Sequence, residues 1–175
     1  FDLPDLPQRL TSRLAHAERP VVVIGGGALA DVVRRWHATH PITQAEAHGL
    51  AMQLLDISAD LVSQLLPRHQ LCDDPDRVQC AWRAERIPIV RPQQWFSRTA
   101  GWFHGTPRLP DGLLPQSWDV TSDTLAACVA MDLGAARDVY RSLRMSQGFG
   151  ALGIGVLYDA GGDDTYEAEV AAQGS

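Results

Sequence analysis

The sequence predicts an α/β fold, a three-layer α/β/α sandwich around a mainly parallel sheet. Two observations near the amino end predict it. Residues 21–24 (Val-Val-Val-Ile) are β-branched, which is typical of a strand that a parallel sheet buries on both faces. Gly25, Gly26 and Gly27 follow directly, and residues 28–40 return to a helical pattern. Strand, glycine turn and helix form a βα unit, the building block of α/β proteins.

Helices are predicted before and after this strand. Leu6, Leu10 and Leu14 recur at every fourth residue and predict a helix over residues 6–17, with these leucines on one face. For the helix over residues 28–40, the predicted inner side consists of Leu29, Val32, Val33 and Trp36.

A longer helix is predicted over residues 43–66, with apolar positions Ala47, Leu50, Ala51, Leu54, Leu61 and Leu65. Residues 73–76 (Asp-Asp-Pro-Asp) form a turn cluster. Two short strands are predicted over residues 78–82 and 87–90. Pro88 cannot donate a hydrogen bond, so it marks the second as an edge strand or a strand start.

The next stretch, residues 93–116, mixes glycine, proline and aromatic residues and is predicted to be irregular. Thr121 or Ser122 can cap a helix that runs over residues 124–133. Another short strand is predicted to start near Arg137, which keeps the α/β pattern to the end of this part.

The composition changes near residue 145 and predicts two domains. Residues 1–144 hold all 11 prolines and all 15 basic residues, each of which is arginine, so the chain contains no lysine. Residues 145–175 hold 7 of the 15 glycines and no proline or basic residue. We therefore predict an α/β domain over residues 1–144 and a short Gly/Asp-rich β tail over residues 145–175.

The same composition excludes several classes of protein. No run of 18 apolar residues is present, so no membrane span is predicted, and no leader pattern opens the chain. The formal charge of −6, without a basic stripe, argues against a nucleic-acid partner. Three cysteines without metal-ligand spacing indicate reduced thiols, a cytoplasmic protein and no metal site. The predicted partner is a small-molecule substrate, and a homo-oligomer stays open.

The first candidate site is the turn formed by Gly25, Gly26 and Gly27. Glycines between a strand and a helix allow backbone N–H groups to approach an anion, and the helix dipole then favours a phosphate. The alternative is a tight turn without a ligand. A nicotinamide site would need a second strand ending in an acid about 20 residues on. The sequence predicts the helix over residues 43–66 there instead.

The second candidate site lies at the start of the later helix. Asp119 and Asp123 flank Thr121 and Ser122. Hydroxyls and free N–H groups at a helix start can hold a phosphate, and a carboxylate can position a cationic group against it. The alternative is a capped helix with an acid in its first turn, which is common.

Together these two segments resemble the amino acid kinase superfamily, the group of acetylglutamate, aspartate and uridylate kinases. Residues 23–27 (Val-Ile-Gly-Gly-Gly) are similar to the family's glycine turn, which binds substrate near the transferred phosphate. Residues 121–127 (Thr-Ser-Asp-Thr-Leu-Ala-Ala) are similar to its helix start, whose acid orients catalytic lysines. Residues 117–123 (Ser-Trp-Asp-Val-Thr-Ser-Asp) look closest to the aminomethylfuran-phosphate kinases of C1-cofactor metabolism. The resemblance covers about residues 1–140.

The resemblance implies an ATP-dependent kinase that uses Mg²⁺ and phosphorylates an aminomethylfuran-phosphate-like or carboxylate acceptor. It implies a catalytic role for Asp123, and it implies that substrate or phosphate is bound by Gly25, Gly26, Gly27, Asp119, Thr121 and Ser122.

The chain departs from the family in two respects. It has no lysine, and neither the family's Lys-x-Gly-Gly-Ser strand nor its nucleotide-binding half has a counterpart. A non-catalytic remnant or scaffold, joined to a β-solenoid-type repeat, is therefore the alternative function.

The tail contains one loose repeat. Residues 146–148 (Ser-Gln-Gly) recur as residues 172–174 (Ala-Gln-Gly), an offset of 26 positions, which resembles one rung of a β-solenoid. Residues 159–166 (Asp-Ala-Gly-Gly-Asp-Asp-Thr-Tyr) resemble the Gly/Asp turns of acidic repeat proteins and, more distantly, calcium-binding repeats. Carboxylates and turn carbonyls suit Ca²⁺, and the alternative is a solvated acidic turn.

Isolated histidines and tryptophans give weaker signals. His37 and His40 lie three residues apart on one predicted helix, a spacing that could chelate a metal. Without a third ligand we predict them as surface residues. The five tryptophans are predicted to anchor the core and loops, and Trp118, inside the second motif, is predicted to line a substrate pocket.

Overall fold

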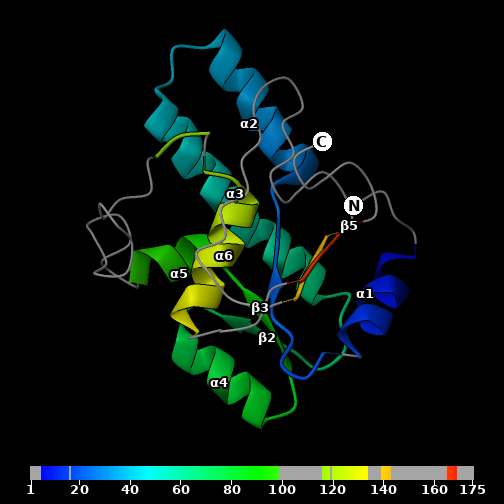
Figure 1. Cartoon of the computed structure of the whole chain (residues 1–175). Helices are drawn as coiled ribbons and strands as arrows, with labels where there is room; N and C mark the ends of the chain where they lie inside the picture. Colours follow the sequence, from blue (N-terminus) through cyan, green and yellow to red (C-terminus); the bar gives the residue numbers. More distant parts are fainter. Residues whose placement is uncertain are drawn as a thin grey trace. The chain divides into compact units, whose positions relative to one another are not determined.

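The chain is a mixed α/β protein that divides into two compact units, Phe1–Val120 and Thr121–Ser175, each described here by itself. The computed structural model describes residues 5–15, 17–98, 116–118, 120–133, 139–142 and 165–168 (Figure 1). The predicted domain boundary at residues 144/145 falls within the second unit, and the Gly/Asp turn at residues 159–164 lies outside the described residues.

The first unit contains five helices and a three-stranded sheet among its described residues. In chain order these are α1 (Leu6–Leu14), β1 (Val22–Val23), α2 (Gly27–Thr39), α3 (Gln44–Ser63), β2 (His69–Cys72), α4 (Pro75–Arg83), β3 (Ile87–Val90) and α5 (Pro92–Arg98). The predicted helices over residues 6–17, 28–40 and 43–66 are confirmed, as is the strand that precedes the three glycines.

The sheet is parallel throughout, with the order β1-β3-β2, so β3 lies in the middle. Val23 pairs with Val90, and Val90 pairs with Cys72. The prediction that Pro88 marks an edge strand is therefore wrong, whereas the alternative of a strand start agrees with its place as the second residue of β3. Pro88 is tolerated in a central strand because β1 begins at Val22, whose partner is Ile89, so no strand residue of β1 faces the proline nitrogen.

Helices cover the sheet through residues that alternate along its strands. On the α3 side, Ile89 packs in a buried cluster with Val22, Ile24, Ala59, Val62 and Leu66. Leu10 and Leu14 of α1 pack against the same cluster, as their spacing predicted. On α4, Val78 and Ala81 are buried, and the Gln70 amide donates to the Arg77 carbonyl at 3.3 Å. Both α3 and α4 therefore pack against β2 and β3.

The inner side of α2 differs from the prediction. Ala30 and Val33 are buried, whereas Val32 and Trp36, predicted to face inward, are exposed. Trp36 instead stacks on the exposed ring of His40, with ring centroids 5.0 Å apart. The buried positions of α2 are small, which lets the helix approach α3 closely.

The caps explain where two helices begin. A capping box starts α3, because the Thr43 hydroxyl accepts the Glu46 N–H and Glu46 accepts the Thr43 N–H at 2.8 Å. The Asp74 side chain accepts the Arg77 N–H at 2.8 Å and starts α4, with Pro75 at the first helical position. The strand predicted over residues 78–82 is therefore wrong, since these residues belong to this helix.

The second unit contains α6 (Ser122–Asp132), β4 (Val139–Ser142) and β5 (Thr165–Ala168) among its described residues. The predicted helix over residues 124–133 and the strand near Arg137 are confirmed. β4 and β5 are parallel and pair Val139 with Thr165, so each residue pairs with the one 26 positions later. The recurring triplets at residues 146–148 and 172–174 lie outside the described residues.

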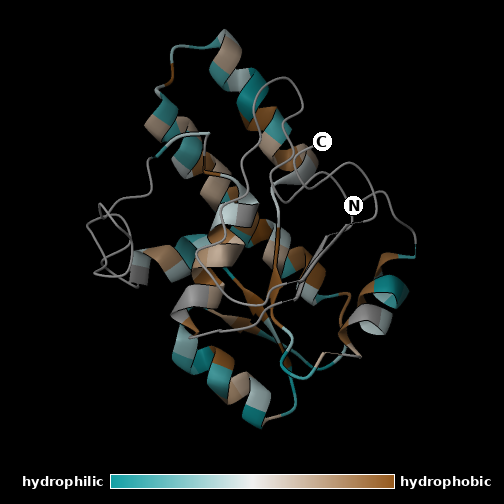
Figure 2. Cartoon of the chain, in the orientation of Figure 1, coloured by the Kyte–Doolittle hydropathy of each residue, from teal (hydrophilic) through white to brown (hydrophobic). Residues whose placement is uncertain are grey.

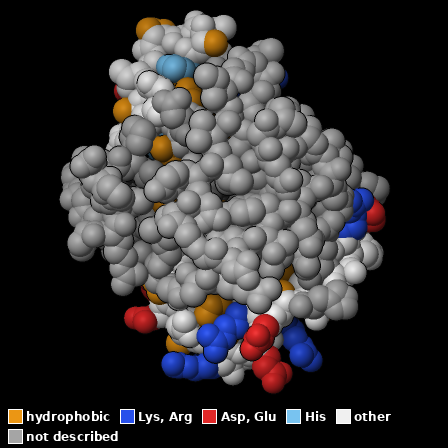
Figure 3. All heavy atoms as spheres, in the orientation of Figure 1, with side chains coloured by type: hydrophobic (Ala, Val, Ile, Leu, Met, Phe, Trp, Pro, Cys, Tyr) orange, Lys and Arg blue, Asp and Glu red, His pale blue; other side chains and the backbone are white. Residues whose placement is uncertain are grey.

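Two surface properties bear on the predicted partners. Within the described residues, no helix is both long enough and apolar enough to cross a membrane. In the view of Figure 3, arginine and acidic side chains lie interspersed where Figure 1 shows α4. The exposed charged residues of α4 and of the turn that follows it have both signs: Asp76, Arg77, Arg83, Glu85 and Arg86. The absence of a nucleic-acid partner stays a prediction.

Candidate functional site at the carboxyl edge of the sheet

The glycine turn lies at the carboxyl end of β1 and leads directly into α2. Gly27 has a φ of +50°, in the left-handed region that favours glycine. A Cβ at Gly26 would lie 2.5 Å from the Ala30 Cβ, so a side chain does not fit there. The start of α2 has no side-chain cap and no acidic residue in its first turn. Its first N–H groups can therefore serve an anion such as a phosphate.

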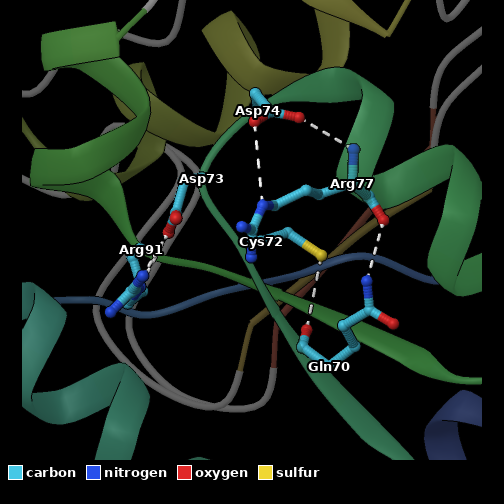
Figure 4. A network of polar contacts seen from close by, with 6 residues as sticks. All are labelled: Gln70, Cys72, Asp73, Asp74, Arg77 and Arg91. Carbon is cyan, nitrogen blue, oxygen red and sulfur yellow. Dashed lines mark hydrogen bonds and ion pairs between the residues drawn. The ribbon is translucent and has the colours of Figure 1, made fainter.

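The neighbouring strands bring charged residues to the same edge. Because all three strands are parallel, their carboxyl ends meet there, and Arg91 follows β3 as Asp73 follows β2. Nε and Nη2 of Arg91 both donate to Oδ1 of Asp73 at 2.7 Å. Asp73 is only 1% exposed and Arg91 30%. Figure 4 shows the two side chains pointing toward one another, and their ion pair fixes the guanidinium at the sheet edge.

A second carboxylate approaches this pair from α3. Oδ1 of Asp56 accepts the backbone N–H of Gln93 at 2.8 Å. Burial raises the pKa of Asp56, and the hydrogen bond from Gln93 and the attraction of Arg91 only partly offset this increase. The carboxyl edge thus brings together Arg91, Asp56, Asp73 and the glycine turn, a combination that can bind charged groups and exchange a proton.

Cys72 at the end of β2 is not a nucleophile. Burial, together with the charges of Asp73 and Asp74, raises the pKa of the thiol to about 12. Its Sγ–H donates to the Gln70 carbonyl at 3.4 Å (Figure 4). The thiol is therefore protonated at neutral pH and acts as a small apolar residue. Cys72, Cys80 and Cys128 form no disulfide, in agreement with the predicted reduced thiols.

The beginning of the second motif packs on α2 and α3. The Trp118 indole N–H donates to Nδ1 of His37 at 3.0 Å, and the Arg34 guanidinium lies 5.1 Å from the centre of its ring. The backbone carbonyl of Ser117 lies 3.1 Å from Nδ1 of His48, so this nitrogen carries the proton. His37 is half-buried, which corrects its prediction as a surface residue, whereas His40 is exposed as predicted.

We expect His48 to make the stability of the first unit depend on pH. Burial lowers the pKa of His48 and outweighs the hydrogen bond to Ser117, which raises it. The unfolded chain therefore binds the proton more readily, and stability is complete above about pH 6.5 and falls as the pH drops below it. We expect His48→Asn to remove this loss, which reaches at most about 1.4 kcal/mol per pH unit.

Urea unfolding followed by tryptophan fluorescence at pH 7.5 and 5.0 measures this effect. All five tryptophans precede residue 121, so the signal reports the first unit. His40→Asn, at an exposed position, serves as the control. If the free energies of unfolding of wild type and His48→Asn differ by the same amount at pH 7.5 and at pH 5.0, His48 is not the source of the pH dependence.

The structure assigns the predicted site residues to both units. Gly25, Gly26 and Gly27 belong to the first unit, and Thr121, Ser122 and Asp123 belong to the second. Thr121 caps α6, since its hydroxyl accepts the Thr124 N–H at 3.4 Å, as predicted. Asp119 lies outside the described residues. A single site made from both motifs therefore stays a prediction.

Sequence reasoning missed Asp56, Asp73 and Arg91. The sequence predicts a turn cluster around Asp73 and predicts no role for Arg91. The available signal was position, because a charged residue directly after a buried parallel strand lies at the edge where ligands bind in α/β sheets. No group of three or more metal-ligating side chains lies within the described part of the chain.

Comparison with known proteins adds no family to this picture. No protein-family model matches the sequence, and no curated protein matches it either.

Proposed function

We propose that the chain carries the acceptor-binding part of an ATP-dependent small-molecule kinase. The proposed fold of residues 1–144 is a three-layer α/β/α sandwich of the amino acid kinase type. The proposed acceptor is a carboxylate or a phosphate ester related to aminomethylfuran phosphate. The resemblance of the two motifs suggests this function, and the chemistry of the carboxyl edge supports it.

The single observation that carries the proposal is the glycine turn. It combines a position at which no side chain fits, Gly26, with an uncapped helix start at the carboxyl end of a parallel strand. Such a turn suits the close approach of a phosphate to the backbone. Arg91 follows the neighbouring strand β3, so a fixed cation lies at the same edge of the sheet.

The proposed reaction transfers the γ-phosphoryl group of ATP to an oxygen of the acceptor and releases ADP. Backbone N–H groups of the glycine turn hold the acceptor, and hydroxyls of Thr121 and Ser122 donate hydrogen bonds to it. Asp123 orients cationic groups around the transferred phosphoryl group. With no lysine in the chain, arginine supplies these groups. Mg²⁺ bound to the nucleotide would neutralise charge on its phosphates.

A phosphoryl-transfer assay tests this function. The 175-residue chain is incubated with γ-labelled ATP, Mg²⁺ and a panel of small carboxylates and phosphate esters. We expect label in at least one acceptor. Label that stays at the level of the protein-free control for every acceptor would contradict a kinase made by this chain alone.

One observation favours the alternative, a non-catalytic scaffold with a β-solenoid-type repeat. The register of β4 and β5 pairs residues 26 positions apart, and the same offset separates the two recurring triplets in the sequence. Stacked parallel strands with a constant offset are what successive solenoid rungs require. An inactive chain in the transfer assay would favour this function.

A further inference from the structure

Helix α3 carries a second apolar surface besides the one that packs on the sheet. Leu50, Ile57, Leu61 and Leu65 are 45%, 49%, 51% and 40% exposed, and half-buried Leu54 lies between the first two. Their spacing of four, three, four and four residues places them on one side of the helix and of the turn that follows it. We call these five residues the apolar stripe. Figure 2 shows apolar residues along much of α3.

The apolar stripe is unusual for a surface of a single chain. It runs for roughly 22 Å along the helix at 1.5 Å per residue. Residues 47–66 contain only two charged residues, Asp56 and Asp60. Contiguous exposed apolar surface of this kind marks a contact with another molecule.

We propose that a second copy of this chain covers the apolar stripe, in an antiparallel contact of α3 with α3. This inference is independent of the proposed kinase function. A two-fold axis near Ile57 brings Leu50 of one copy to Leu65 of the other, and Leu54 to Leu61. The stripe is therefore complementary to itself when reversed, as a two-fold contact requires. An unrelated partner needs no such symmetry.

Charges at the two ends of α3 also favour an antiparallel contact. Glu46 lies in the first turn of α3, and exposed Arg68 follows its last turn. Hydrogen bonds from Thr43 lower the pKa of Glu46, so this end carries a carboxylate. Antiparallel packing brings Glu46 of each copy toward Arg68 of the other and opposes the helix dipoles. Parallel packing would place like charges together.

The size of the contact predicts a reversible dimer. Five apolar side chains from each copy give an interface at the lower end of the standard range, about 1,200 Å² in total. We therefore expect association at roughly micromolar concentrations. The dimer is then visible as a change in mass with protein concentration.

Sedimentation velocity of the full chain between 1 and 200 µM, about the range that a micromolar contact requires, tests the dimer. Leu61→Glu places a charge in the apolar stripe of both copies, and we expect it to raise the dissociation constant at least about tenfold. Gln53→Glu adds the same charge at an exposed position of α3 outside the stripe and should leave it unchanged. A wild-type chain that stays monomeric over the whole concentration range would overturn the proposal. Equal dissociation constants for Leu61→Glu and Gln53→Glu would overturn it as well.

Cross-linking tests the direction of packing. In a Cys80→Ser background, which removes the exposed native thiol, a short bismaleimide should link Ile57→Cys into a dimer. Leu50→Cys should remain unlinked, because an antiparallel contact separates the two Leu50 positions by roughly 22 Å. Linking of Leu50→Cys as readily as Ile57→Cys would contradict the antiparallel contact, and linking of neither would contradict the contact itself.

Discussion

Arg91→Ala is expected to destabilise the first unit by about 3 kcal/mol, the low end of the range for a broken buried ion pair. The substitution removes both hydrogen bonds to Oδ1 of Asp73 and leaves a carboxylate that is 1% exposed without this ion pair. The low end applies because Arg91 itself is 30% exposed. Urea unfolding followed by tryptophan fluorescence measures the change, since all five tryptophans precede residue 121.

Arg77→Ala is the matched control for this prediction. Arg77 pairs with Asp74 at 3.9 Å, and its side chain is half exposed, so its loss should cost less than about 1 kcal/mol. Adding Asp73→Asn to Arg91→Ala removes the buried charge and should restore part of the stability. If Arg91→Ala unfolds at the same urea concentration as Arg77→Ala, the ion pair does not stabilise the sheet edge.

Asp123→Ala is expected to reduce phosphoryl transfer at least about 100-fold, the usual effect of removing a group that stabilises charge in the transition state. The proposed role of Asp123 is to orient cationic groups, so Asp123→Asn should lose nearly as much activity. The phosphoryl-transfer assay described above, with the acceptor that gives the strongest signal, measures the effect.

Asp76→Ala controls for the loss of an acid at a helix start, because Asp76 lies in the first turn of α4 and is exposed. Circular dichroism of both variants reports whether helix content is kept. Full transfer by Asp123→Ala would remove Asp123 from the proposed site.

Local patterns were sufficient where a single segment determines its own structure. The β-branched run at residues 21–24 and the three glycines predicted β1 and the turn, and the apolar spacing over residues 43–66 predicted α3. In these segments, propensity, cap and periodicity favour the same structure.

The start of α4 differs from the predicted turn because the turn residues are a helix cap. Asp74 and Pro75 are the residues that begin a helix, an N-cap followed by proline at the first helical position. The segment at residues 78–82 contains enough apolar residues to suggest a strand as well. Its helical state follows from the hydrogen bond between Asp74 and the Arg77 N–H.

The charged pair at the sheet edge could not be predicted without β2. That strand, His69–Cys72, is short and half polar, and its pairing with β3 makes it a strand. Only this pairing brings Asp73 beside Arg91, 18 residues away in sequence. The sequence also did not predict which side of α3 is exposed. The leucines that predicted the helix are largely not those that pack on the sheet.

The most direct test of the central claim is an amide NMR titration of the full chain with methyl phosphate at constant ionic strength. The claim is that the glycine turn at the carboxyl end of β1 binds a phosphate. We predict that the amide resonances of Gly25, Gly26 and Gly27 shift together on addition of ligand, with a single dissociation constant. Resonances of the glycine turn that stay unshifted at about 10 mM ligand, well above a millimolar affinity, would contradict the claim.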